Sequence, residues 1–221
     1  MTATTIRATT SPTGEGLSSG TTALLITAPL VMAVGRVLLV PLDDQNWDTT
    51  MTKMAAHDAR SNAGWLIAMA ASGLLGATAV ILARRLGRTG RTRASMFATV
   101  TTAMGWAGCA ATCVAGLYLS VAAKAPDRAV QVKIQDDFNN SVATGLIFLM
   151  CVLAAVGYIV LAVGLRRSSL VSRGTAVLLG LGGVTTLLTM AGPLTALLVL
   201  TAVVLAAGHT QLARNLSPGH G

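Results

Sequence analysis

The residues most able to carry chemistry are two groups of aspartates beside long apolar segments. Asp43, Asp44 and Asp48 follow the first apolar segment, and Asp136 and Asp137 precede the fourth. Paired carboxylates can hold Mg²⁺, whose remaining coordination positions take substrate phosphates. A carboxylic acid beside an apolar cavity can also protonate an alkene or an epoxide. Asp43, Asp44, Asp136 and Asp137 are therefore candidate catalytic residues, with magnesium as a cofactor under this hypothesis alone. The alternative is that they are solvated loop acids.

Arg36 is the only charged residue well inside a predicted apolar span. Ionisable groups at such positions are costly, which raises a functional hypothesis: binding of an anionic head group, or pairing with Asp43 or Asp44. A structural anchor that reaches the outer interface is the alternative. The candidate ligand-binding residues are Arg36, Asp48, Trp65, Trp106 and Tyr118.

Sulfur and imidazole groups give little further indication of a site. Cys109, Cys113 and Cys151 all lie in apolar segments, and such an odd set is no disulfide framework. A soft-metal site would need support from a histidine in the core, where we expect none, because His209 falls near the cytoplasmic end of the last helix. Packing of small cysteines between helices is the simpler explanation, so no metal site is predicted.

The composition decides the class of protein that must position these residues. Of 221 residues, 53% are hydrophobic and 11% charged, less than half of the roughly 25% charge typical of soluble domains. This excludes a water-soluble enzyme, a disordered chain and a secreted disulfide scaffold. The spans carry no Lys, Asp or Glu of the kind that a proton pump or a retinal protein needs. The sequence predicts an all-α, polytopic helical membrane protein.

Five apolar segments give a prediction of about six transmembrane helices. Four segments have the length of a span, about 20 residues or more: 21–40, 62–83, 96–122 and 142–165. Residues 175–207 would reach roughly 50 Å as one helix, and Gly192-Pro193 interrupts them. We therefore predict two short helices, 175–190 and 193–208, either as two spans or as a re-entrant hairpin. We predict a disordered cytoplasmic tail at 1–20, a single transmembrane helical domain at 21–208 and a second cytoplasmic tail at 209–221.

The two long outer loops carry amphipathic patterns. A helix from Asp48, as its cap, through Arg60 would place Trp47, Met51, Met54 and Ala55 on one face, opposite Lys53, His57 and Arg60. Such a helix suits the interface plane of a bilayer. In the second loop, Val130, Ile134 and Phe138 recur every four residues and indicate a helix, whereas the alternation of Val130, Val132 and Ile134 leaves a strand open.

The distribution of charge sets the orientation. One side holds ten basic residues: Arg7, Arg84, Arg85, Arg88, Arg91, Arg93, Arg166, Arg167, Arg173 and Arg214. The other side holds five: Lys53, Arg60, Lys124, Arg128 and Lys133. The positive-inside rule then predicts a cell-membrane protein with both termini in the cytoplasm. The net charge of +8 is a topology signal, and no nucleic-acid partner is expected.

Three resemblances bear on function. The composition, with Arg far above Lys and much Ala, Gly, Thr and Val, resembles that of uncharacterised small multi-pass membrane proteins of high-GC actinobacteria. The aspartate groups resemble the aspartate-rich motifs of membrane prenyltransferases, and the arrangement as a whole is similar to small membrane terpene cyclases. Those resemblances imply an enzyme acting on an apolar, isoprenoid-type substrate. The other hypothesis, which the spans alone support, is a helical bundle that binds a lipid or another apolar small molecule, or serves as a membrane-complex subunit.

Overall fold

The computed structural model describes residues 17–39, 46–188 and 195–216, and within these ranges it is helical, without strands. The all-α prediction is therefore confirmed. The helices are α1 (Ser19–Leu38), α2 (Trp47–Ala56), α3 (Asp58–Arg88), α4 (Thr92–Ala122), α5 (Arg128–Asn139), α6 (Val142–Arg167), α7 (Arg173–Leu188) and α8 (Thr195–Leu216).

Four of these helices, α1, α3, α4 and α6, are long and apolar enough to cross a membrane. They correspond to the four predicted long spans, although α1 ends at Leu38, before the predicted limit of 40. A multi-pass membrane protein is supported, and the expected total of about six spans is only roughly matched. With 16 residues, α7 reaches about 24 Å, which is less than the roughly 30 Å of a hydrocarbon core.

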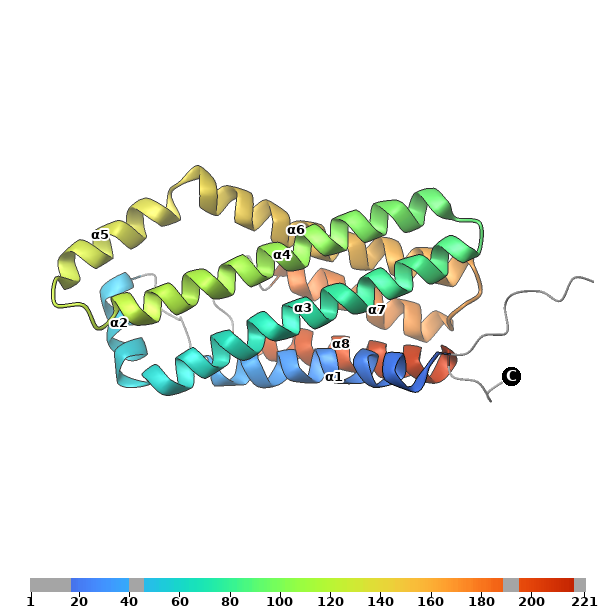
Figure 1. The fold of residues 1–221 in the computed structure, drawn as a ribbon, viewed down its shortest axis with the longest axis horizontal. Coiled ribbons are helices and arrows are strands. Elements are labelled where there is room, and N and C mark those ends of the chain that lie inside the picture. Colours follow the sequence, from blue (N-terminus) through green and yellow to red (C-terminus); the bar gives the residue numbers. More distant parts are fainter. Residues whose placement is uncertain (1–16, 40–45, 189–194, 217–221) are drawn as a thin grey trace, which may run out of the picture.

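The long helices and the last two close into a ring. Each helix contacts the next in the order α1, α3, α4, α6, α7 and α8, and α8 contacts α1 (Figure 1). Large leucines fill the ring toward the end where α3 ends and α4 begins: Leu25, Leu75, Leu82, Leu86, Leu161, Leu165, Leu179, Leu205 and Leu212. The ring is thus tightly filled at one end.

The last apolar segment forms two helices, as predicted from Gly192-Pro193, which themselves lie outside the described residues. Figure 1 shows that α7 and the beginning of α8 stop well short of the end where α2 and α5 lie. The other end of α8 differs from the prediction, because the helix continues to Leu216, about two turns beyond residue 208. Part of the expected C-terminal tail is therefore helical.

Glycines let α4 approach α6 at backbone distance. A Cβ built on Gly105 would lie 2.1 Å from the backbone nitrogen of Ala154, and one on Gly157 would lie 2.2 Å from a methyl of Thr102. Helices in lipid gain most of their association energy from such close packing of small residues. The α4–α6 pair is therefore a rigid part of the ring.

Both ends of the ring use an arginine to cap a neighbouring helix. At one end, Arg60 of α3 donates to the carbonyls of Val37 and Leu38, which end α1. At the other, Arg91 donates to the carbonyl of Arg167 and the hydroxyl of Ser168, where α6 ends. The last carbonyls of a helix have no partner within it, so these guanidinium groups supply the missing hydrogen bonds.

The first outer helix, α2, lies across the end of the bundle (Figure 1). The predicted apolar face is confirmed at Met51 and Met54, which are buried. Two details of the predicted helix, its cap and its end, were wrong. The side chain of Asn46, rather than that of Asp48, caps α2, by accepting from the amides of Asp48 and Thr49. The helix also ends at Ala56, so Arg60 belongs to α3.

The second outer loop is the helix α5, so the strand alternative is wrong. Its expected apolar face does not pack into the bundle, because Val130 and Ile134 are exposed and only Phe138 is partly buried. The one buried residue of α5 is Gln135. The amphipathic pattern therefore turns outward, where a bilayer interface would cover it.

The segments that the charge distribution assigns to the same side of the membrane lie at the same end of the bundle. The start of α1, the end of α8 and the connections α3–α4 and α6–α7 all lie at one end, called the basic end below (Figure 1). The helices α2 and α5 lie at the other, called the α2/α5 end. The structure has no membrane to orient it, so cytoplasmic termini stay a prediction.

We expect a reporter that fluoresces only in the cytoplasm to be active when fused after residue 221. The same reporter inserted between Pro126 and Asp127, in the α4–α5 connection at the opposite end, should be inactive. Cell fluorescence normalised to protein amount measures both. Activity at both positions would contradict the topology, and the reverse pattern would invert the orientation.

We expect Gly105→Ala to destabilise the bundle by about 1–3 kcal/mol, because the added methyl meets the α6 backbone and forces the helices apart. Gly73→Ala on α3 is the matched control, since a Cβ there meets nothing within 4 Å. The thermal midpoint in detergent micelles should fall for Gly105→Ala and stay level or rise for Gly73→Ala. Equal midpoints would show that the α4–α6 contact is looser than the structure has it.

Candidate functional site: a cavity at the α2/α5 end

A cavity of about 340 Å³ lies inside the ring toward the α2/α5 end. It is lined from all eight helices, mostly by apolar and aromatic side chains, which is typical of a site for a small molecule. All three tryptophans of the chain, Trp47, Trp65 and Trp106, line it. The candidate residues Arg36, Trp65 and Trp106, which are far apart in the sequence, are therefore brought together.

The cavity lies beside the described ends of α7 and α8. Thr186 near the end of α7 and Thr201 near the beginning of α8 line its inner side. On the outer side, α5 and the first turns of α6 rise away from α4 (Figure 1). Phe138 and Phe148 from this raised segment also line the cavity. The cavity is thus enclosed between α7 and α8 on one side and the α5–α6 segment on the other.

Two tryptophans form rigid walls. The indole of Trp65 lies flat on Gly116 of α4, where a Cβ would come within 2.3 Å of the ring. Trp106 packs over Gly76 of α3 and makes an edge-to-face contact with Tyr158, with ring centroids 6.0 Å apart. Both indoles are about 95% buried, and neither indole N–H has a hydrogen-bond acceptor among the described residues.

The threonine hydroxyls that line the cavity donate to nearby backbone carbonyls. Thr112 donates to the carbonyl of Gly108, Thr201 to that of Leu197, and Thr144 to that of Phe138. These hydroxyls keep only their acceptor lone pairs toward the cavity.

Arg36 is the one charged residue among those described that line the cavity. It stands in the last turn of α1 and is partly buried. No hydrogen bond or ion pair joins it to any other residue in the described ranges, whose two ion pairs are Lys124–Asp58 and Arg128–Asp48. Its expected partners Asp43 and Asp44 lie outside these ranges.

The cysteines form part of the wall between α4 and α6. Cys109 and Cys151 line the cavity, Cys113 is buried one turn beyond Cys109, and all three are free thiols. The hydroxyl of Thr112 lies 3.7 Å from the sulfur of Cys151. Within the described part of the chain, no three His, Cys, Asp or Glu side chains gather in a way that could hold a metal ion.

His209 was misplaced by the sequence analysis. It is fully buried in the core, where its Nε2 lies 3.3 Å from the hydroxyl of Tyr158 and its Nδ1 lies 2.8 Å from the carbonyl of Leu205. The continuation of α8 to Leu216 moves His209 from the helix end into its interior. Two groups that were not foreseen as partners, a tyrosine and a histidine, thereby satisfy each other away from the cavity.

Of the remaining candidate residues, Asp136, Asp137 and Tyr118 do not line the cavity. Asp136 and Asp137 are exposed on α5, although their neighbours Gln135 and Phe138 line the cavity. Tyr118 is exposed and donates to the side-chain oxygen of Gln131 at 3.3 Å. Asp43 and Asp44 lie outside the described residues, so the structure does not test whether the two aspartate pairs meet.

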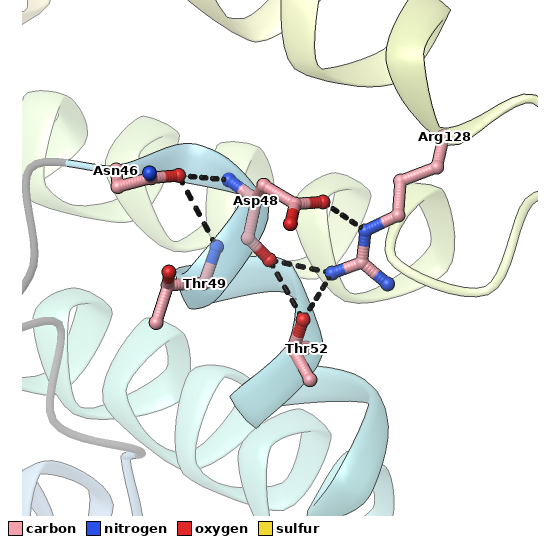
Figure 2. A network of polar contacts seen from close by, with 5 residues as sticks. All are labelled: Asn46, Asp48, Thr49, Thr52 and Arg128. Carbon is pink, nitrogen blue, oxygen red and sulfur yellow. Dashed lines mark hydrogen bonds and ion pairs between the residues drawn. The ribbon is translucent and has the colours of Figure 1, made fainter.

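Asp48 has a structural task in joining the two outer helices. The guanidinium of Arg128, at the start of α5, donates to the Asp48 carboxylate, to the Asp48 carbonyl and to the Thr52 hydroxyl of α2 (Figure 2). The Asp48 carboxylate is 62% exposed, so water screens the charge pair. This contact holds α5 against α2 beside the cavity.

Comparison with protein-family models, with curated proteins and with solved structures finds no match for this chain. The geometry of the cavity is therefore the observation from which function is inferred.

We expect Arg128→Ala to loosen α5 while the ring stays folded. An exposed ion pair contributes about 1 kcal/mol or less, so the thermal midpoint should change little. Amide hydrogen exchange in α5 should nevertheless become faster, because α5 has few other contacts with the bundle. Lys133→Ala, an exposed residue of the same helix, is the control. Unchanged exchange in α5 would mean that Arg128 does not hold it.

Proposed function

We propose that this protein is an integral membrane helical bundle that binds a lipid or another apolar small molecule in the cavity at its α2/α5 end. The observation that carries the proposal is the cavity itself, about 340 Å³ in volume and lined largely by aromatic and aliphatic groups. A space of this size within a bundle otherwise packed at glycine contacts loses the dispersion energy that side chains would supply. An apolar ligand restores those contacts.

Access from the bilayer is consistent with the same geometry. The first turns of α6 expose Val142, Leu146 and Phe148, so their outer surface suits lipid. The cavity lies on the inner side of this segment, which also contributes Thr144, Ile147 and Cys151 to its wall. A hydrocarbon chain therefore has a short apolar path from the membrane to the cavity.

The enzymatic alternative requires carboxylates at the cavity. The described carboxylates of Asp136 and Asp137 are exposed on α5 and do not line it. No described contact favours the alternative over ligand binding, and the same holds for a role as a membrane-complex subunit. Both stay predictions from the sequence.

Tryptophan fluorescence tests the proposal directly, because all three tryptophans line the cavity. A brominated long-chain alcohol should quench them in a saturable manner. Ala115→Phe, which fills the cavity from α4, should weaken this binding roughly 10- to 100-fold through lost apolar burial. Ala107→Phe is the control, since Ala107 is exposed on the same helix and does not line the cavity.

A second filling variant keeps the test independent of misfolding at one site. Ile147→Trp enters the cavity from α6 and should weaken binding in the same way. Quenching that is linear in probe concentration and equal in all variants would show contact with bulk lipid only, and would contradict the proposal.

A further inference from the structure

The charge inside the cavity carries an inference about the class of its ligand. Arg36 is the single charged residue among the described residues that line the cavity. A charge in apolar surroundings is costly unless it is paired and hydrogen-bonded. The described residues offer Arg36 neither a hydrogen bond nor an ion pair.

Arg36 is not needed as a helix cap. It stands in the last turn of α1, where basic side chains often satisfy terminal carbonyls. Here Arg60 of α3 makes these contacts instead, with distances of 3.2 Å to the carbonyl of Leu38 and 3.0 Å to that of Val37. The described residues therefore leave the donors of Arg36 without an acceptor.

A second donor in the same wall also lacks an acceptor. The indole N–H of Trp65 is buried and has no acceptor among the described residues, and an indole can only donate. The threonine hydroxyls of the cavity, by contrast, already donate to backbone carbonyls. The wall therefore offers a cation and a buried donor beside an apolar space, and this combination selects for an oxyanion attached to a hydrocarbon.

We propose that the ligand is a single-chain amphiphile with a carboxylate head, whose oxygens accept from Arg36 and whose chain occupies the apolar cavity. This inference rests on the proposed function and narrows it. Guanidinium and carboxylate match as a two-point pair, which a neutral alcohol of equal length cannot form. Arg36 is then a specificity-determining residue that distinguishes an acid from its neutral analogue.

The test compares a brominated long-chain carboxylate with the brominated alcohol of the same length, by saturable quenching of tryptophan in micelles. The carboxylate should bind the unaltered protein more tightly than the alcohol. Arg36→Gln should weaken the carboxylate about 10- to 100-fold and leave the alcohol within about twofold. Arg36→Lys should recover part of the loss, because it keeps the charge without the two-point geometry.

Three controls separate the sources of the effect. Lys133→Gln removes an exposed positive charge from the same end of the bundle and should leave both affinities unchanged. Acetate, the head without a chain, should not compete at equal concentration. If acetate competes as well as the long-chain acid, the site holds a free anion and the proposal is overturned.

Other outcomes identify which proposal fails. Equal affinity for acid and alcohol, unchanged by Arg36→Gln, would mean that Arg36 extends to water and that only the carboxylate inference is wrong. Saturable binding of neither probe would overturn the proposed function as well. If Asp43→Asn with Asp44→Asn tightens carboxylate binding at least tenfold, these residues neutralise Arg36 within the protein and the inference is overturned.

Discussion

The packing of α7 and α8 against the four long helices determines where the ring is filled and where it holds a cavity. Six helices close into a ring, but α7 has 16 residues whereas α3 and α4 have 31 each. At the basic end all six contribute side chains, and buried leucines such as Leu82 and Leu212 fill the centre. Toward the α2/α5 end the described part of α7 ends at Leu188 and that of α8 begins at Thr195. The cavity lies at this level of the ring, where Thr186 and Thr201 line it.

The polar groups of the bundle are arranged so that few of them remain without partners in an apolar medium. Threonine hydroxyls donate to carbonyls of their own helices, Arg60 and Arg91 cap neighbouring helices, and Tyr158 meets His209. Each arrangement avoids the cost of a buried donor or acceptor without a hydrogen bond. Among the described residues, Arg36 and the indoles of Trp65 and Trp106 are exceptions, and all three line the cavity. Unfilled volume and unsatisfied donors therefore coincide.

The sequence predicted which segments are helical better than it predicted which residues are buried and which residues they contact. Apolar length gave the four long spans, and Gly192-Pro193 indicated the division between α7 and α8, because these signals are local. Arg36, Trp65 and Trp106 were selected as isolated exceptions to an apolar pattern, and they share one cavity. The burial of His209 and the role of Asn46 as the cap of α2 were missed. The first depends on how far α8 continues, and the second on where α2 begins. Neither boundary is set by composition alone.

The contacts around the cavity differ in strength, and this difference decides which wall can move when a ligand binds. On the α4–α6 side, Gly105 meets the backbone of Ala154, so movement there would break close packing along two helices. On the outer side, α5 is tied to α2 by the Arg128–Asp48 contact, in which the aspartate is 62% and the arginine 33% exposed, and the first turns of α6 are mostly exposed. An exposed ion pair costs little to break, whereas lost packing costs more. A ligand longer than the cavity would therefore displace α5 and the beginning of α6, while the part of the ring that carries Arg36 and Trp65 stays in place.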